Sequence, residues 1–262
     1  MLKFVAIQAA PSLMHVRFLV ALLAVLTHTL LCASGETPMK DVLEGSSQLI
    51  VVTSDSWSAD RGTLQLYDRA TDRSWRRTGT AVPVMLGRNG LAWGVGLHGE
   101  EATKREGDGR APAGIFELER VHGGAGATKL ENFPYRKMSD VMEGIDDAQS
   151  RFYNRFLDPA DVPARERDWK RTETVRSANP MFRWLVEVKH NWEQRPGYGS
   201  CIWLHIWKAP GVATSGCTTM ETAALERLVH WLDARKRPLL VQVPRTELQR
   251  LMPELSGMPN ER

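Results

Sequence analysis

Residues 199–207 read Gly-Ser-Cys-Ile-Trp-Leu-His-Ile-Trp, and this stretch decides the fold class of the chain. Successive side chains of a strand point to opposite faces, so the stretch divides into an apolar face and a mixed face. The apolar face carries Ile202, Leu204 and Ile206. The mixed face carries Cys201, Trp203, His205 and Trp207. We therefore expect a strand over 201–207 with one face in the core. The other face places an ionisable imidazole among indoles, as in a partly desolvated cleft.

A second short segment, TSGCTT over residues 214–219, places Cys217 twelve residues after His205. A helix is expected from Met220 to Ala234, so Cys217 would lie at a helix amino terminus, where unpaired N–H groups and the helix dipole favour a thiolate. The same N–H groups can hold an oxyanion, and Gly216 permits close backbone approach. Because the loop can return Cys217 to His205, the pattern predicts a thiolate beside an imidazolium. A structural thiol and a hydrogen-bonded histidine are the alternative that spacing alone leaves open.

The rest of the chain is mostly strand-like, with frequent turns. The expected strands are Gln48 to Thr53, Thr63 to Arg69, a stretch from Trp75 leading to Val82–Arg88, Ile115 to Leu118, Met181 to Val188, and Pro238 to Val243. Residues 107–114 form a turn-dense segment. Residues 123–177 are polar, and an excursion of this length is typical of a lid or a binding loop. We expect one mostly β domain with a few helices over residues 35–262.

Charge excludes one class of function. The chain of 262 residues has 34 Lys and Arg against 31 Asp and Glu. Proteins that bind nucleic acid through its phosphates carry a surface stripe with a clear excess of Lys and Arg. In this chain the basic run at 165–171 is interleaved with Glu166 and Asp168. We therefore expect no binding of nucleic acid.

The amino terminus resembles an export signal. Arg17 precedes an apolar run from Phe18 to Leu26, and small residues follow at 33–35. We expect residues 1–34 to be a cleaved signal peptide and the protein to reach the periplasm or the cell envelope. One alternative is an uncleaved membrane anchor, but the apolar run is shorter than the ~20 residues of a spanning helix. The other is a lipid anchor at Cys32, but Leu31 before it is bulkier than lipoprotein processing usually accepts.

The catalytic segment resembles the L,D-transpeptidase domain of the YkuD type, whose hallmark is a His followed by a Ser/Thr-His-Gly-Cys turn. His205 matches the first histidine, Thr214 the Ser/Thr, Gly216 the glycine and Cys217 the nucleophile. Residues 84–88 resemble the family's strand ending in Leu-Gly-Arg, and residues 107–116 resemble its TPxGxF stretch; the resemblance covers roughly residues 48–243. Two positions depart from the pattern: Ser215 replaces a second histidine and Thr219 an arginine.

The resemblance implies a β-sandwich or barrel with a long polar insertion and a helix after Cys217. It also implies a peptidoglycan enzyme that forms a thioester between Cys217 and a stem peptide, with His205 as sole base and backbone N–H groups near Gly216 and Cys217 as the oxyanion hole. An amine acceptor gives a crosslink or an exchanged D-amino acid, whereas water gives a carboxypeptidase, endopeptidase or amidase. Carbapenem-type inhibitors are expected ligands, and no protein partner or cofactor is expected. A non-catalytic wall-binding module of the same fold is the alternative from another class.

Several further residues are candidates for binding substrate: Trp203, Trp207, Lys208, Tyr153, Arg110 and His190, with Trp169 as a further lining residue. Arg110, Arg151 or Lys208 can replace the missing arginine, because each offers a cation for a carboxylate. Metal binding is not expected, since His190 and His205 have no further ligands at metal-like spacing.

The mature chain has two cysteines, Cys201 and Cys217. On one strand, Cys201 lies about 13 Å from His205 at ~3.3 Å per residue. A disulfide needs Cα atoms within about 7 Å, so a bridge and a Cys217–His205 pair are close to exclusive. We expect two free thiols.

Overall fold

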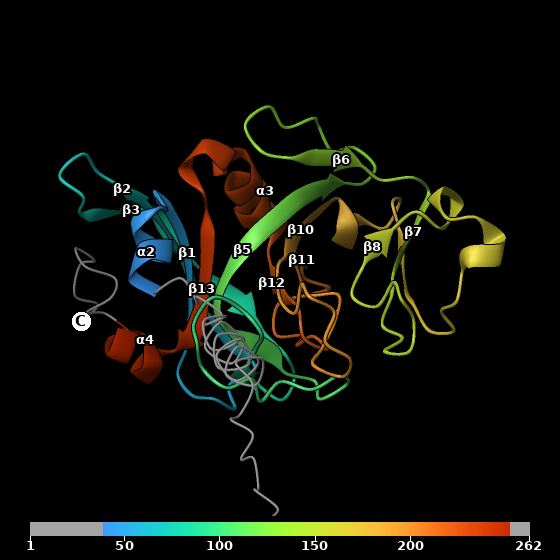
Figure 1. Cartoon of the computed structure of the whole chain (residues 1–262). Helices are drawn as coiled ribbons and strands as arrows, with labels where there is room; N and C mark the ends of the chain where they lie inside the picture. The colour runs from blue at the N-terminus through green and yellow to red at the C-terminus, as the bar shows by residue number, and fades with distance from the viewer. Residues whose placement is uncertain (1–38, 252–262) are drawn as a thin grey trace, which may run out of the picture. The chain divides into compact units, whose positions relative to one another are not determined.

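The described part of the chain is residues 39–251 of the computed structural model (Figure 1). The expected signal peptide and the cysteine at position 32 lie outside it. Among the described residues, no helix has both the length and the apolar character needed to cross a bilayer.

Eight strands close into a barrel. Their order around it is β10 (Trp184–Val188), β11 (Trp203–Ile206), β12 (Thr218–Met220), β3 (Trp75–Met85), β2 (Arg61–Arg69), β1 (Gln48–Ser54), β13 (Leu239–Pro244) and β5 (Ala111–Gly123). Pairing of β10 with β5 closes the ring. The short strands β4 (Leu91–Trp93) and β6 (Tyr135–Lys137) attach to β5. The expectation of a mostly β fold with few helices is confirmed, and the architecture is a barrel.

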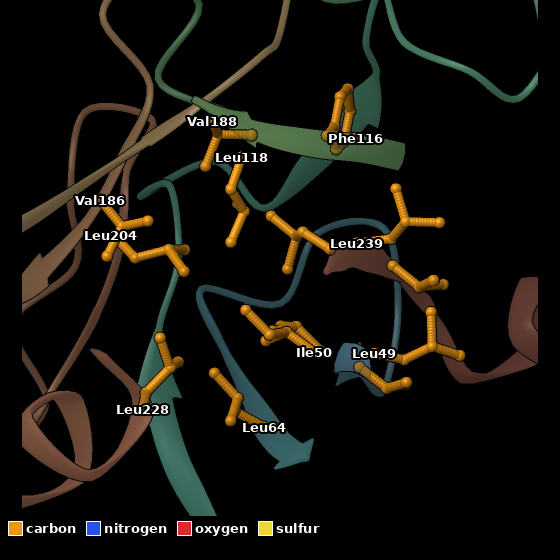
Figure 2. Close-up of a cluster of buried hydrophobic side chains, with 14 of the residues drawn as sticks. Leu49, Ile50, Leu64, Phe116, Leu118, Val186, Val188, Leu204, Leu228 and Leu239 are labelled. Carbon is orange, nitrogen blue, oxygen red and sulfur yellow. The ribbon is translucent and has the colours of Figure 1, made fainter. Parts of the chain in front are cut away.

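Some strands of the barrel, among them β1 and β13, are buried along their whole length. All seven residues of β1 are buried, and β1 pairs antiparallel with β2 and parallel with β13. Figure 2 shows aliphatic side chains of β1, β2, β5, β10, β11, β13 and the helix α3 (Thr222–Trp231) converging on one cluster. Burying one such side chain contributes roughly 1.5–3 kcal/mol relative to leaving it in water, so this cluster holds the strands together.

The two faces of β11 separate as the alternation predicts. Ile202, Leu204 and Ile206 belong to the main core cluster, whereas Cys201 and Trp203 belong to a second cluster on the other side. The strand is shorter than expected, because Cys201 takes a positive φ of 54° before β11 begins. Trp207 follows β11 and packs against the main cluster, so its placement on the mixed face was wrong.

The segment after Cys217 is a strand, which corrects the expected helix start. Thr218 and Thr219 are buried and pair in parallel with Leu204 and His205, because β-branched side chains fit a buried pleated surface. Helix α3 begins only at Thr222 and ends at Trp231. Cys217 is therefore not at a helix amino terminus.

The polar insertion carries a small sheet of its own, drawn in yellow tones in Figure 1. Its strands are β8 (Phe156–Leu157), β7 (Val141–Gly144) and β9 (Glu173–Arg176), in that order. Two 3₁₀ turns, η1 (Pro159–Asp161) and η2 (Ala164–Glu166), lie between β8 and β9. Met142, Phe156 and Val175 join the second cluster, so the insertion packs against Trp203 and the cysteines.

Other element ends differ from the expected ones for local reasons. The turn-dense segment ends at Arg110, since Ala111–Gly114 is already part of β5. Asn179 caps the 3₁₀ turn η3 (Pro180–Phe182), so β10 starts at Trp184. A further 3₁₀ turn is η4 (Ala234–Lys236). Two short helices, α2 (Met39–Glu44) and α4 (Arg245–Leu251), were not anticipated.

Candidate active site

Cys217 lies at a cavity of about 400 Å³ between the barrel and the insertion. The lining residues are Arg88, Lys104, Glu106, Gly107, Asp146, Thr172, Glu173, Ser200, Cys201, Ile202, Ser215, Gly216 and Cys217. The cysteine itself is buried at 9% exposure, so its sulfur is reached only through this cavity. The cavity is therefore the place where a ligand meets the thiol.

The turn that carries Cys217 is fixed by Thr214. The Thr214 hydroxyl donates to the Cys217 carbonyl oxygen at 2.6 Å and accepts from the Gly216 N–H at 3.1 Å. A Cβ at Gly216 would lie 3.1 Å from the Arg110 carbonyl oxygen, so only glycine fits without displacement. The Gly216 N–H, an expected oxyanion donor, is thus held by Thr214 in this state.

The cavity walls carry charges of both signs. Arg88 and Lys104 are its cations; Glu106, Asp146 and Glu173 are its carboxylates. Lys104 is almost fully buried and pairs with Asp108 at 2.6 Å. Arg88 donates to the Ser215 hydroxyl at 3.3 Å, so Ser215 holds a cation beside the turn that carries Cys217.

Sequence reasoning missed most of these charged residues. Arg88 was visible as the end of the Leu-Gly-Arg stretch, and Asp146 as part of an Asp-Asp pair in the insertion. Lys104, Glu106 and Glu173 have no motif around them, and only the tertiary packing of the insertion on the barrel brings them to the thiol.

The Cys217 thiol is neutral in this environment. Burial raises its pKa above the ordinary value, and the negative charge of Glu173 raises it further. The Trp203 N–H and the charge of Lys104 oppose this rise in pKa but do not cancel it. The expected resting thiolate at a helix terminus was wrong, because β12 and not a helix follows the cysteine.

His205 lies on β11 opposite Thr219 of β12. Cys217 lies just before β12 and two residues before Thr219, so its backbone is offset from that of His205 by roughly 7 Å along the strand direction. The His205 Nδ1 is 2.9 Å from the Ile206 carbonyl oxygen. A carbonyl cannot donate, so Nδ1 carries the proton and Nε2 keeps a lone pair, as a base requires.

The imidazole of His205 is neutral as well. Burial lowers its pKa to about 4, against the partly opposing bond to Ile206. Its ring lies 5.2 Å from that of Phe182, centroid to centroid. Within residues 39–251 no hydrogen bond joins His205 to Cys217. The expected ion pair is therefore replaced by two neutral partners.

Cys201 lies next to Cys217, which the strand spacing did not predict. The Cys217 thiol donates to the Cys201 carbonyl oxygen at 3.6 Å, and both sulfurs are free thiols. Because Cys201 precedes β11 in a left-handed conformation, the expectation that it is remote from Cys217 was wrong, whereas the expectation of two free thiols is confirmed. Burial and nearby carboxylates, with Glu173 first among them, raise the pKa of its thiol as well.

Two residues predicted to bind substrate, Tyr153 and Trp203, lie behind the cavity wall. Tyr153 is buried behind it and donates to Glu106 Oε2 at 2.5 Å, while the Ser200 hydroxyl donates to the same oxygen at 2.8 Å. These two bonds orient Glu106 toward the cavity. Burial, with the bond to Glu106, raises the pKa of Tyr153 well above its usual range. Trp203 is buried in the second cluster and forms part of the cavity's support.

The other sequence candidates lie outside the cavity wall. Lys208 is exposed in the turn after β11, and Arg151 pairs with Glu166 and Asp168. The Arg110 side chain donates to the Leu91 carbonyl oxygen and lines a different hollow. Trp169 donates to Glu143. The cations that reach the cavity are Arg88 and Lys104 instead.

His190 is held on both sides by the backbone. Its Nδ1 accepts from the Val95 N–H at 3.2 Å, and its Nε2 lies 3.0 Å from the Tyr198 carbonyl oxygen. Burial lowers its pKa to about 3, so it stays neutral. Over residues 39–251, no group of three His, Cys, Asp or Glu side chains is arranged to hold a metal ion.

The chain was compared with known proteins at three levels. No family model, no curated protein and no solved structure matches it.

Proposed function

We propose that the chain is an exported cysteine acyltransferase of the L,D-transpeptidase type, which acts on peptidoglycan stem peptides. One observation carries the proposal: the Cys217 thiol opens into a cavity whose walls hold two cations and three carboxylates. Stem peptides carry free amines and carboxylates along a short chain, so they match walls of both signs. The resemblance of the His205 and Thr214–Cys217 segments to that family supports the same conclusion.

The proposed reaction starts from a neutral pair. Attack on the carbonyl before a D-amino acid needs the thiol proton to move to His205 Nε2. His205 lies on β11, and Cys217 lies immediately before the paired strand β12. A rotation of the Cys217 side chain on substrate binding is therefore part of the proposal. The sulfur then bonds to the carbonyl carbon, and the imidazolium returns its proton to the departing amine.

The thioester is resolved by an acceptor. An amine of a second stem displaces the sulfur and forms an amide, which gives a crosslink or an exchanged D-amino acid; water gives a carboxylic acid. The three carboxylates attract an ammonium acceptor, so we favour aminolysis over hydrolysis.

A non-catalytic wall-binding module is the second candidate. Two observations favour it: the pKa of Cys217 is raised, and within residues 39–251 no hydrogen bond joins His205 to the thiol. In that case the charged cavity binds stem peptides without covalent chemistry.

Incubation of the mature chain with a disaccharide-tetrapeptide, followed by mass spectrometry, tests the proposal. We expect dimeric or amine-exchanged products, and a carbapenem adduct on the peptide that contains Cys217. Cys217→Ser is expected to lose both while its melting temperature stays close to that of the wild type, and Cys201→Ser serves as the matched control. No product and no adduct with the wild-type chain would support the binding module.

A further inference from the structure

A second hollow of about 620 Å³ lies beside the first, within the range of small-molecule sites of about 300–1,000 Å³. Its lining residues are Trp57, Leu91, Ala92, Trp93, Thr103, Arg105, Asp108, Arg110 and Glu247. None of these residues belongs to the wall around Cys217. The hollow therefore needs an account of its own.

Two indoles form its apolar surface. The rings of Trp57 and Trp93 meet edge to face with centroids 5.1 Å apart, and both are half-buried. The backbone holds them in place, because the Leu91 N–H donates to the Trp57 carbonyl oxygen and the Trp93 N–H donates to Thr103. His98 stacks on Trp93 at 5.3 Å. The indoles therefore keep their orientation without a ligand.

Charged side chains stand around the indoles. Arg105 and Arg110 are each anchored through Nη1 to backbone carbonyl oxygens. A guanidinium has five N–H donors in a fixed plane, so each side chain can hold further acceptors in a set direction. Glu247 adds a carboxylate, which is tied to Arg250 at 2.8 Å.

One segment separates this hollow from the Cys217 cavity. Along residues 103–110 the side chains divide between the two spaces. Thr103, Arg105, Asp108 and Arg110 line the second hollow. Lys104, Glu106 and Gly107 line the Cys217 cavity. The Lys104–Asp108 ion pair at 2.6 Å ties the two sides of this wall together. A ligand that extends over residues 103–110 can therefore occupy both spaces.

We propose that the second hollow binds a carbohydrate, namely a chain of hexopyranose units. A pyranose presents a face of C–H groups that packs on an indole, and an edge of hydroxyls that accept from guanidinium and donate to carboxylate. The hollow offers both within one open space. This inference rests on the proposed function in one respect, since the glycan strand of the same polymer then lies beside its stem peptide.

Titration with a tetramer of β-1,4-linked N-acetylglucosamine, followed by tryptophan fluorescence and calorimetry, tests the proposal without any turnover. We expect saturable binding by the mature chain. Trp57→Ala should raise the Kd by about tenfold, since a stacked aromatic face is lost. Arg105→Gln, at an exposed position that leaves the core intact, should raise the Kd severalfold. Trp192→Ala removes a half-buried indole that lines neither space, and it should bind as the wild type does.

Two outcomes would overturn the carbohydrate site. One is no saturable binding by a wild-type chain whose melting temperature is normal; the other is binding that Trp57→Ala and Arg105→Gln leave unchanged. A fluorescence response to free stem peptide but not to the tetramer would assign the hollow to peptide instead. Sugar binding without turnover of disaccharide-tetrapeptide would keep this site and refute the proposed acyl transfer. Turnover without sugar binding would support the acyl transfer and refute the carbohydrate site.

Discussion

The carboxyl group of Glu173 controls the charge seen by the thiols. Glu173 is an exposed residue of β9, but it also lines the cavity, where burial of the carboxyl and the charge of Asp146 raise its pKa to about 7. Below that pH it is neutral, and above it the negative charge raises the pKa of Cys217. Glu173 thus couples the reactivity of Cys217 to pH near neutrality.

Glu173→Gln should lower the pKa of Cys217, because the amide has a similar shape and no charge. We expect faster alkylation of Cys217 by iodoacetamide, with the gain over the wild type growing as pH rises above about 7. Glu131→Gln removes a carboxylate that does not line this cavity, and it should leave the rate unchanged. Equal alkylation profiles for Glu173→Gln and the wild type would show that this carboxylate does not act on the thiol.

His205→Asn should separate proton transfer from thiol acidity. The asparagine cannot accept and return a proton, so turnover should fall by roughly 10²–10⁴-fold. The pKa of Cys217 is set by burial, Glu173, Trp203 and Lys104, so the alkylation profile should stay as in the wild type. A variant that retains full turnover would remove His205 from the mechanism. A shifted profile at reduced turnover would instead indicate a resting thiolate–imidazolium pair.

At the scale of elements, Asn154 joins the insertion to the barrel. Its Nδ2 donates to the carbonyl oxygens of His190 and Asn191 at 2.8 and 2.7 Å, and its Oδ1 accepts from the Cys201 N–H at 2.9 Å. All three bonds are buried, and Asn154 takes a positive φ of 60° that asparagine tolerates better than most residues. One side chain therefore sets the position of Cys201 relative to the insertion.

Asn154→Ala should destabilise the protein by roughly 2–4 kcal/mol. The buried carbonyl groups of His190 and Asn191 and the buried Cys201 N–H would each lose the hydrogen bond to the Asn154 side chain. Chemical denaturation of the variant beside Gln149→Ala, an exposed position of the same insertion, measures this difference. We also expect Cys201 to be alkylated faster, since its backbone loses an anchor. A loss of free energy of unfolding below about 0.5 kcal/mol, as for an ordinary surface site, would mean that the insertion is held elsewhere.

The sequence predicted strands wherever a residue pattern alone decides burial. β1, β2, β11 and β13 lie where alternation or continuous apolar runs placed them, and the two faces of β11 divide as expected up to Trp207. The helix start at Met220 was wrong because Met220 pairs with Ile206 of β11 and is the last residue of β12, so α3 begins only at Thr222. The charged cavity was out of reach, since Lys104 and Glu173 meet Cys217 only through packing between distant segments.

At the scale of the whole described unit, buried histidines should make stability depend on pH. Burial lowers the pKa of His98, of His190 to about 3 and of His205 to about 4. The unfolded chain binds these protons near pH 6.5, so between pH 6.5 and 4 it holds more protons than the folded chain. Their contribution is complete above pH 6.5 and is lost as pH falls. Glu173 has the opposite effect on stability between about pH 4.5 and 7, because its raised pKa makes the folded chain bind this proton more tightly than the unfolded chain. It is one carboxyl group against three histidines.

We therefore expect the free energy of unfolding to fall from about pH 6.5 to about pH 5, by roughly 1 kcal/mol per pH unit for each fully buried histidine. Urea unfolding at several pH values measures this slope. His205→Asn has one such histidine fewer and should show a shallower decline. A stability that is flat or rises on acidification would mean that these imidazoles are already protonated in the folded protein.

The parallel pairing of β1 with β13 has a consequence for how the protein is made. These are the first and last strands of the barrel, separated by nearly two hundred residues, and β13 also pairs with β5. Contacts so distant along the chain form slowly, because a long loop must close before they contribute. During synthesis from the amino terminus, one edge of β1 stays unpaired until β13 has been synthesised. If the chain is exported as proposed, we expect this late pairing to favour an unfolded polypeptide before it crosses a membrane.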